Sequence, residues 1–156
     1  MQSDVKTRLF EVTTKRIEGL TDSRGENVRS MLYADHGIDI DSVKVILGYH
    51  VIASISDSEA EALVYDLFAD PVVERGVTDS RLLEEFTTPP EIAIQVGYKP
   101  GVTDNPGQAA LDGLRTLFPS LSNASVFTTK TYAFWGIPDG VSPENIAETI
   151  HNPMIE

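Results

Sequence analysis

The stretch VGYKPGVTDNPGQAAL, from Val96 to Leu111, has the composition of a strand end, a turn rich in Gly, Pro, Thr and Asp, and the first turns of a helix. The earlier stretch TTKRIEGLTDSRGENV, from Thr13 to Val28, is a weaker version of the same pattern. In both stretches two glycines flank a Thr-Asp pair, and a helical pattern follows. The chain is therefore predicted to contain the same strand–turn–helix corner twice.

The similarity extends beyond the corners and indicates a tandem duplication. In the corners, the matched residues lie 82 positions apart: Gly19, Asp22 and Gly25 correspond to Gly101, Asp104 and Gly107. In the next segment the spacing is 83, and Ser42, Val43 and Tyr49 correspond to Ser125, Val126 and Tyr132. The segment DPVVE (70–74) then returns to a spacing of 82 opposite NPMIE (152–156). Matches in the same order at nearly constant spacing are difficult to obtain by chance.

Each half has the pattern of a β-α-β-α-β unit. Apolar alternation predicts strands at 10–14 and 92–96, and long strands at 43–55 and 125–137. Helical spacing predicts a first helix in each half, ended by Gly37 or Pro119, and a second helix that begins near Ser56 or Ser142 and ends before Pro71 or Pro153. We therefore predict an α+β fold of two tandem, ferredoxin-like related repeats, with antiparallel sheets, helices on one face and pseudo-twofold pairing.

The same pattern predicts the domain boundaries. The first repeat spans 1–79, a linker with a Pro-Pro stop spans 80–90, and the second repeat spans 91–156. The second repeat stops at MIE, where its last strand should begin, so we expect a truncated repeat at the front of a longer protein. The long strand is partly apolar on both faces, and we expect the second repeat to cover the face that the helices leave bare.

Composition excludes several classes of function. The 156 residues carry a net charge of −12, which disfavours nucleic-acid binding because such a chain repels phosphate backbones. The absence of cysteine excludes disulfides, thiolate metal sites and a cysteine nucleophile. Neither a signal peptide nor an apolar run long enough to cross a membrane is present, so the sequence predicts a cytoplasmic protein without membrane contact.

The glycine corners allow a functional and a structural interpretation. A phosphate could bind at the helix N-terminus beside Gly101 and Gly107. However, the spacing fits neither a Walker loop nor G-x-G-x-x-G. The structural interpretation, in which an aspartate caps the helix and the glycines permit the turn, is favoured. The residues assigned to structural turns are Gly19, Asp22, Gly25, Gly101, Asp104 and Gly107.

No other pattern predicts an active site. His36, His50 and His151 lie in different predicted elements, without the spacing of metal ligands. We therefore assign no catalytic, cofactor-binding or metal-binding residue. The aromatic residues of the long strands are predicted to serve in packing or at an interface; they are Tyr49, Tyr132, Phe134 and Trp135.

The corner at 96–111, the long strand with a central tyrosine and the NPMIE ending together resemble the PurS family, the small subunit of phosphoribosylformylglycinamidine synthase. The first half is similar through GLTDSRG and ADPVVE, but Ile17 and Glu18 stand where the family has Lys-Pro. The resemblance implies a non-catalytic module that bridges the ATP-dependent synthetase and the glutaminase in purine biosynthesis. ATP, Mg²⁺ and the catalytic cysteine are then expected elsewhere in this ligase.

A ligand-sensing regulatory module is the alternative. Tandem repeats of ferredoxin-like topology often bind amino acids where the repeats meet, and the glycine corners could face such a ligand. The expected partners of the PurS-like module are the synthetase and glutaminase domains or subunits, with self-association as a further expectation. A free-standing enzyme is the interpretation that the sequence supports least.

Overall fold

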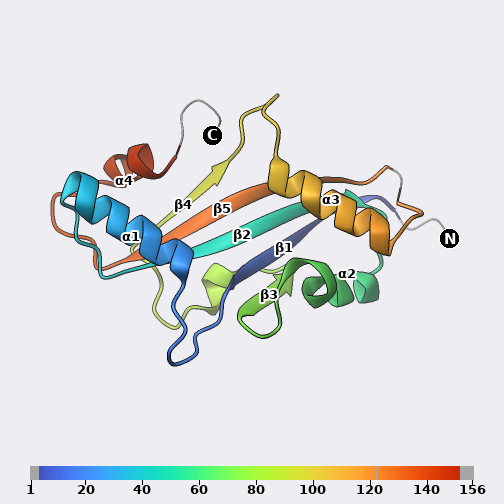
Figure 1. Ribbon diagram of the computed structural model, residues 1–156, viewed down its shortest axis with the longest axis horizontal. Helices are drawn as coiled ribbons and strands as arrows, with labels where there is room; N and C mark the ends of the chain where they lie inside the picture. The colour runs from blue at the N-terminus through green and yellow to red at the C-terminus, as the bar shows by residue number, and fades with distance from the viewer. Residues whose placement is uncertain (1–3, 122, 152–156) are drawn as a thin grey trace.

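The computed structural model describes residues 4–121 and 123–151, and these residues form one α+β unit (Figure 1). The strands are β1 (Lys6–Thr14), β2 (Ser42–Ala53), β3 (Glu74–Thr78), β4 (Ile92–Gly97) and β5 (Ser125–Trp135). The helices are α1 (Ser23–His36), α2 (Asp57–Leu63), α3 (Asn105–Leu117) and α4 (Pro143–Ile150). A π-helical turn (Val64–Phe68) extends α2, and a 3-10 helix (Leu82–Glu85) lies between β3 and β4.

The five strands form a single antiparallel sheet in the order β3-β1-β2-β5-β4. Its centre is the long β2–β5 ladder, which runs without interruption from the Ser42–Trp135 pair to the Ile52–Ser125 pair. The antiparallel sheet with its helices is consistent with a ferredoxin-like kind of fold. Strands from the two predicted repeats are therefore hydrogen-bonded to each other within one sheet.

Local sequence signals set the helix boundaries. Asp22 caps the N-terminus of α1, and Gly37 ends this helix in the left-handed conformation, with φ of 65°. Ser56 and Glu59 form a capping box at the start of α2, and Ser142 caps α4. These helices therefore begin and end close to the predicted residues. The second helix changes to π geometry after Leu63.

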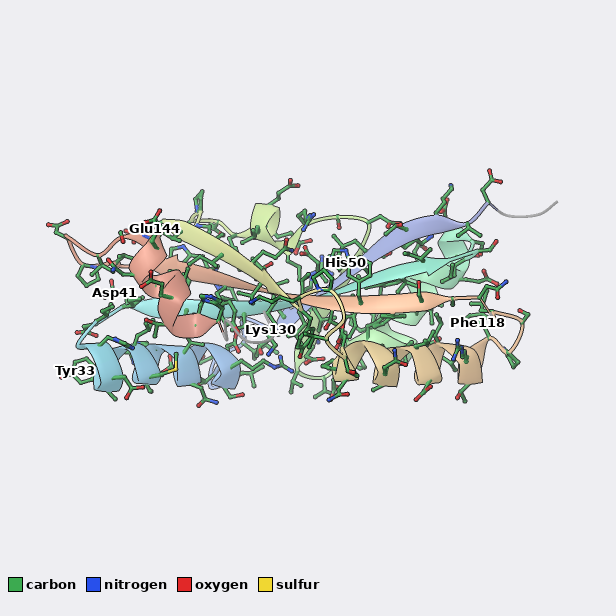
Figure 2. The ribbon with its side chains drawn as sticks, turned by 90° about the horizontal axis from the view of Figure 1, so that it is seen from above. Tyr33, Asp41, His50, Phe118, Lys130 and Glu144 are labelled. Atoms are coloured by element: carbon green, nitrogen blue, oxygen red, sulfur yellow. The ribbon has the colours of Figure 1, made fainter. Side chains whose placement is uncertain are left out.

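All four described helices pack on one face of the sheet. Figure 2 shows α1 and α3 in a layer along one side, with His50 on the other side. One core cluster joins Phe10 and Val51 to Leu63 and Leu114 from the helices. A second cluster, near the other end of β2 and β5, joins Val45 and Phe134 to Leu32 and Ile146. Together the two clusters contain apolar side chains of the helices and the odd-numbered side chains of β2, which therefore face the helices.

The opposite face of the sheet, which we call the open face, is crossed by the segment 79–91. Leu82 of the 3-10 helix is 2% exposed, and its amide donates a hydrogen bond to the buried carboxylate of Glu11 at 2.9 Å. Farther along this face, Phe127 is 45% exposed and stacks on His50 with ring centroids 4.6 Å apart. The predicted linker is therefore a packed segment that covers one part of the open face and leaves another part accessible.

The expectation that the second half of the chain would cover the bare sheet face was wrong. The two halves share one sheet, because β2 and β5 satisfy each other's backbone hydrogen bonds along their whole common length. The open face is instead covered in part by residues 79–91. The segment MIE, at which the second repeat is predicted to be truncated before its last strand, lies outside the described residues.

Candidate functional site

The first glycine corner connects α1 to the centre of the sheet. The Asp22 carboxylate accepts a hydrogen bond from the Gly25 amide at 3.2 Å through Oδ1, and one from the Val45 amide at 3.0 Å through Oδ2. A Cβ at Gly25 would lie 2.0 Å from the carbonyl oxygen of Val43. The helix can therefore approach the strand this closely only because residue 25 has no side chain.

The second corner has the corresponding contacts. Asp104 accepts hydrogen bonds from the Gly107 amide at 2.8 Å and from the Thr128 amide at 2.5 Å. A Cβ at Gly107 would lie 2.8 Å from the carbonyl oxygen of Val126. Gly19 and Gly101, which precede the two aspartates, have φ of 80° and 83°. The inner glycines thus face strand carbonyls, which leaves no space for an anion between helix and strand.

The predicted aromatic residues lie in different environments. Tyr132 and Phe134 are 9% and 0% exposed within the second core cluster, and Tyr49 packs on Phe68 in the first. Trp135 lies on the open face, where its indole N–H donates to the Thr88 carbonyl oxygen at 3.0 Å. Its ring meets Phe86 edge to face, with centroids 5.1 Å apart. Trp135 also borders a cavity.

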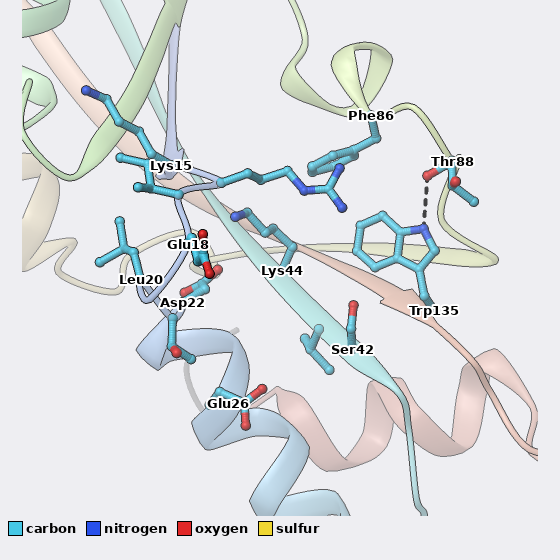
Figure 3. Close-up of a pocket in the computed structure, with 14 residues that line it drawn as sticks. Lys15, Glu18, Leu20, Asp22, Glu26, Ser42, Lys44, Phe86, Thr88 and Trp135 are labelled. Carbon is cyan, nitrogen blue, oxygen red and sulfur yellow. Dashed lines mark hydrogen bonds between the residues drawn. The ribbon is translucent and has the colours of Figure 1, made fainter.

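Two adjoining cavities form a hollow on the open face, beside the first corner (Figure 3). The narrower cavity, of about 330 Å³, lies between the end of β1, the start of β2 and the segment 82–86. The wider cavity, of about 660 Å³, extends toward the β1–α1 loop and Trp135. Both are lined by Lys15, Arg16, Ile17, Lys44 and Phe86. We refer to the two together as the basic hollow.

The narrower cavity is lined mainly by basic residues among its charged groups, although the chain as a whole is strongly acidic. Its lining contains Lys15, Arg16, Lys44 and Arg75, against the single carboxylate of Glu85. Arg75 binds that carboxylate, with Nη2 to Oε1 at 2.9 Å. Lys15 donates from Nζ to the carbonyl oxygen of Pro71. Lys15, Arg16 and Lys44 therefore have no ion pair among the described residues.

Lys44 is the central residue of the hollow. It extends from β2 toward the end of β1 in Figure 3, and its Nζ donates to the Thr14 carbonyl oxygen at 2.7 Å. Burial lowers the pKa of Lys44, and the nearby positive charge of Arg16 lowers it further, although the Asp22 carboxylate opposes both effects. A partly desolvated ammonium beside a second cation favours the approach of an anion.

Apart from Glu85, the acidic groups of the hollow lie on the wider side. Glu18, Asp22 and Glu26 line that cavity and not the narrower one. The hollow is therefore polar and electrically asymmetric, with cations at its inner end, carboxylates toward the loop and the aromatic rings of Phe86 and Trp135 along one wall. Such an arrangement can bind and orient a small molecule, but it contains no histidine to transfer a proton near neutral pH.

The described residues contain no cluster of three or more His, Asp or Glu side chains arranged to bind a metal ion. None of the helices in the described ranges is both long enough and apolar enough to cross a membrane.

The chain was compared with protein-family models, curated proteins and solved structures. No match was found in any of the three comparisons. The function must therefore be argued from the residues and their geometry.

Sequence reasoning did not find the basic hollow. The one available signal was Lys44, a charged residue within the apolar run of β2, but its partners are distant in sequence. Arg16 precedes it in the β1–α1 loop, and Phe86 follows it in the predicted linker. Only the folding of residues 79–91 over the sheet brings the three together.

Proposed function

We propose that the chain is a non-catalytic, PurS-like double module of phosphoribosylformylglycinamidine synthase, which acts by contact with the synthetase and the glutaminase. The observation that carries the proposal is the equivalence of the two corners. Asp22 and Asp104 each bind an inner glycine and a strand amide, and the amides of Val45 and Thr128 are 83 residues apart, as the sequence repeat requires.

The central ladder supports the same proposal. With a spacing of 83, the counterpart of Ser42 is Ser125 and the counterpart of Ile52 is Trp135. The ladder pairs Ser42 with Trp135 and Ile52 with Ser125, so exchanging the two strands reproduces the register. This is the property of an isologous contact between two similar units, and it supports a pseudo-twofold axis through the β2–β5 ladder.

Two further features favour a contact role over catalysis. The open face carries the exposed Phe127 on β5, an apolar side chain suited to docking. The inner glycines pack against backbone, which disfavours the alternative of an amino-acid sensor with its ligand at the corners. The expected synthetase and glutaminase partners, and the use of ATP and Mg²⁺ elsewhere in the enzyme, rest on the PurS resemblance.

The test separates the two activities of such a ligase. Removing this segment from the source organism's enzyme should strongly reduce glutamine-dependent formation of formylglycinamidine ribonucleotide, while turnover with added ammonia persists. Restoring the wild-type segment should restore glutamine use. Unimpaired growth without purines after deletion, or ATP or glutamine hydrolysis by the isolated chain, would contradict the proposal.

A further inference from the structure

We propose that the basic hollow binds a phosphate monoester, with the phosphate between Arg16 and Lys44 and the organic body against Phe86. The binding site goes beyond the contact role proposed above and does not depend on it. It uses the side chains of Arg16, Lys44 and Phe86, none of which makes the hydrogen bonds of the two corners.

Uncompensated positive charge in the narrower cavity favours an anion. The chain has a net charge of −12, yet this cavity is lined by four cations and one carboxylate. Arg75 is paired with Glu85, which leaves the charges of Lys15, Arg16 and Lys44, and the Lys15 ammonium is directed to the Pro71 carbonyl. The charges of Arg16 and Lys44 together match the dianionic form of a phosphate monoester, and the ion would relieve the repulsion among the three cations.

Lys44 and Arg16 provide hydrogen-bond donors for a phosphate. Lys44 is half-buried, and one of its three ammonium donors is used by the Thr14 carbonyl at 2.7 Å. The guanidinium of Arg16 provides a planar set of donors that suits two phosphate oxygens. The donors come from a strand and from the loop that follows the neighbouring strand, so the sheet fixes their spacing.

Aromatic rings beside the cations can contact the organic body of the ligand. Phe86 lines both cavities, and its edge-to-face contact with Trp135 forms an aromatic wall beside the cations. The carboxylates of Glu18 and Glu26 lie on the wider side, where they would repel a second anionic group. The site therefore favours a ligand with one phosphate and an uncharged flat body over a polyanion.

The only tryptophan of the chain provides a direct measurement, because Trp135 lines the wider cavity. Inorganic phosphate should change its fluorescence in a saturable manner, and sodium chloride at matched ionic strength should not. Calorimetry should show that phenyl phosphate binds more tightly than inorganic phosphate, and that neither phenol nor benzoate binds comparably. Failure of both phosphates to bind at about 10 mM, well above a millimolar Kd, would overturn the proposal.

Matched variants locate the site. Lys44→Met keeps the aliphatic stem and should weaken phosphate binding about tenfold or more, as expected for the loss of a charge-assisted hydrogen bond. Lys130→Met makes the same change of charge on β5, at an exposed position outside the hollow, and should alter affinity by less than about twofold because solvent screens the distant charge. Equal weakening by both variants would indicate general attraction to cations and would overturn the proposal.

Arg16→Gln provides a second variant in case Lys44→Met does not fold. Arg16 is exposed, so its replacement should leave the melting temperature unchanged while weakening phosphate binding to a similar extent. Unchanged affinity in folded Arg16→Gln would contradict the proposed position of the phosphate. Equal binding of phenol and phenyl phosphate would also overturn the proposal, since it would assign the site to the aromatic wall alone.

Discussion

The carboxylate of Asp22 holds the amide of Val45, so that one side chain caps α1 and also ties this helix to the middle of β2. Asp22 is 9% exposed and Val45 is 1% exposed, so the hydrogen bond between them is buried. Asp22→Asn can still accept from Gly25, but its amide nitrogen cannot accept from Val45. We expect a loss of about 1–3 kcal/mol in the free energy of unfolding, the cost of an unsatisfied buried donor.

Urea denaturation of the variant measures this loss, and Asp35→Asn is the control because Asp35 is exposed on the same helix. Asp104→Asn should have an effect of the same sign through Thr128. Equal stability of Asp22→Asn and Asp35→Asn would show that the bond to Val45 contributes nothing measurable.

The close approach of helix and strand at Gly25 should make this position intolerant of alanine. The added Cβ would lie 2.0 Å from the Val43 carbonyl oxygen, so α1 must move away from β2. Overpacking of this kind costs about 1–3 kcal/mol. In Gly97→Ala the nearest atom would be 3.6 Å away, on Thr129, and thermal unfolding of this control should resemble the wild type. A folded Gly25→Ala variant with unchanged melting temperature would contradict the close packing of α1 on β2.

Glu11 should make the protein less stable as the pH rises. Burial raises the pKa of Glu11 above its ordinary value of 4.5, although the Leu82 amide and Arg81 partly oppose this effect. Between the ordinary and the raised pKa the folded protein retains a proton that the unfolded chain has released. Stability therefore falls as the pH increases through this interval.

Glu11→Gln removes this titration and keeps an acceptor for the Leu82 amide. The difference in unfolding free energy between the variant and the wild type should increase from pH 4.5 upward in favour of the variant. Glu61→Gln, at an exposed position on α2, is the control. A difference in unfolding free energy between Glu11→Gln and the wild type that does not change with pH would show that the pKa of Glu11 is not raised in the folded protein.

Asp57 should produce the opposite pH dependence. Its hydrogen bond and charge interaction with Arg8, at 2.5 Å, lower the pKa of the Asp57 carboxyl below the ordinary value of 3.8. The resulting stabilisation is present above pH 3.8 and is lost as the pH falls through the lowered pKa. Asp57→Asn should be less stable than the wild type at neutral pH, with a difference that shrinks in acid. Urea midpoints across the acid range test this, with the exposed Asp66→Asn as control.

Local features of the fold could be predicted from the sequence because short-range rules determine them. Asp22 and Ser142 begin helices, Gly37 ends one, and alternation placed the long strand at Val43–Ile55 within two residues of the observed Ser42–Ala53. These signals act through neighbouring residues, and no tertiary context overrides them here.

The arrangement of the strands could not be predicted in the same way. The alternation of apolar and polar residues distinguishes the two faces of β2. It does not indicate which strand pairs with the edge of β2 that β1 leaves open. The basic hollow was missed for a related reason, since Arg16, Lys44 and Phe86 belong to three separate segments. Their meeting depends on the path of residues 79–91, whose charged composition resembles that of an ordinary exposed linker.

The central ladder also has a consequence for protein synthesis. β2 is complete at Ala53, but its partner β5 is complete only at Trp135, 82 residues later. At translation rates of about 5–20 residues per second, this interval lasts about 4–16 s. During that time β2, a strand rich in valine and isoleucine, can pair with β1, while the backbone groups of its other edge have no partner from its own chain. Nascent chains of this length should therefore be the form of the protein most prone to aggregate, and the form that most needs a chaperone.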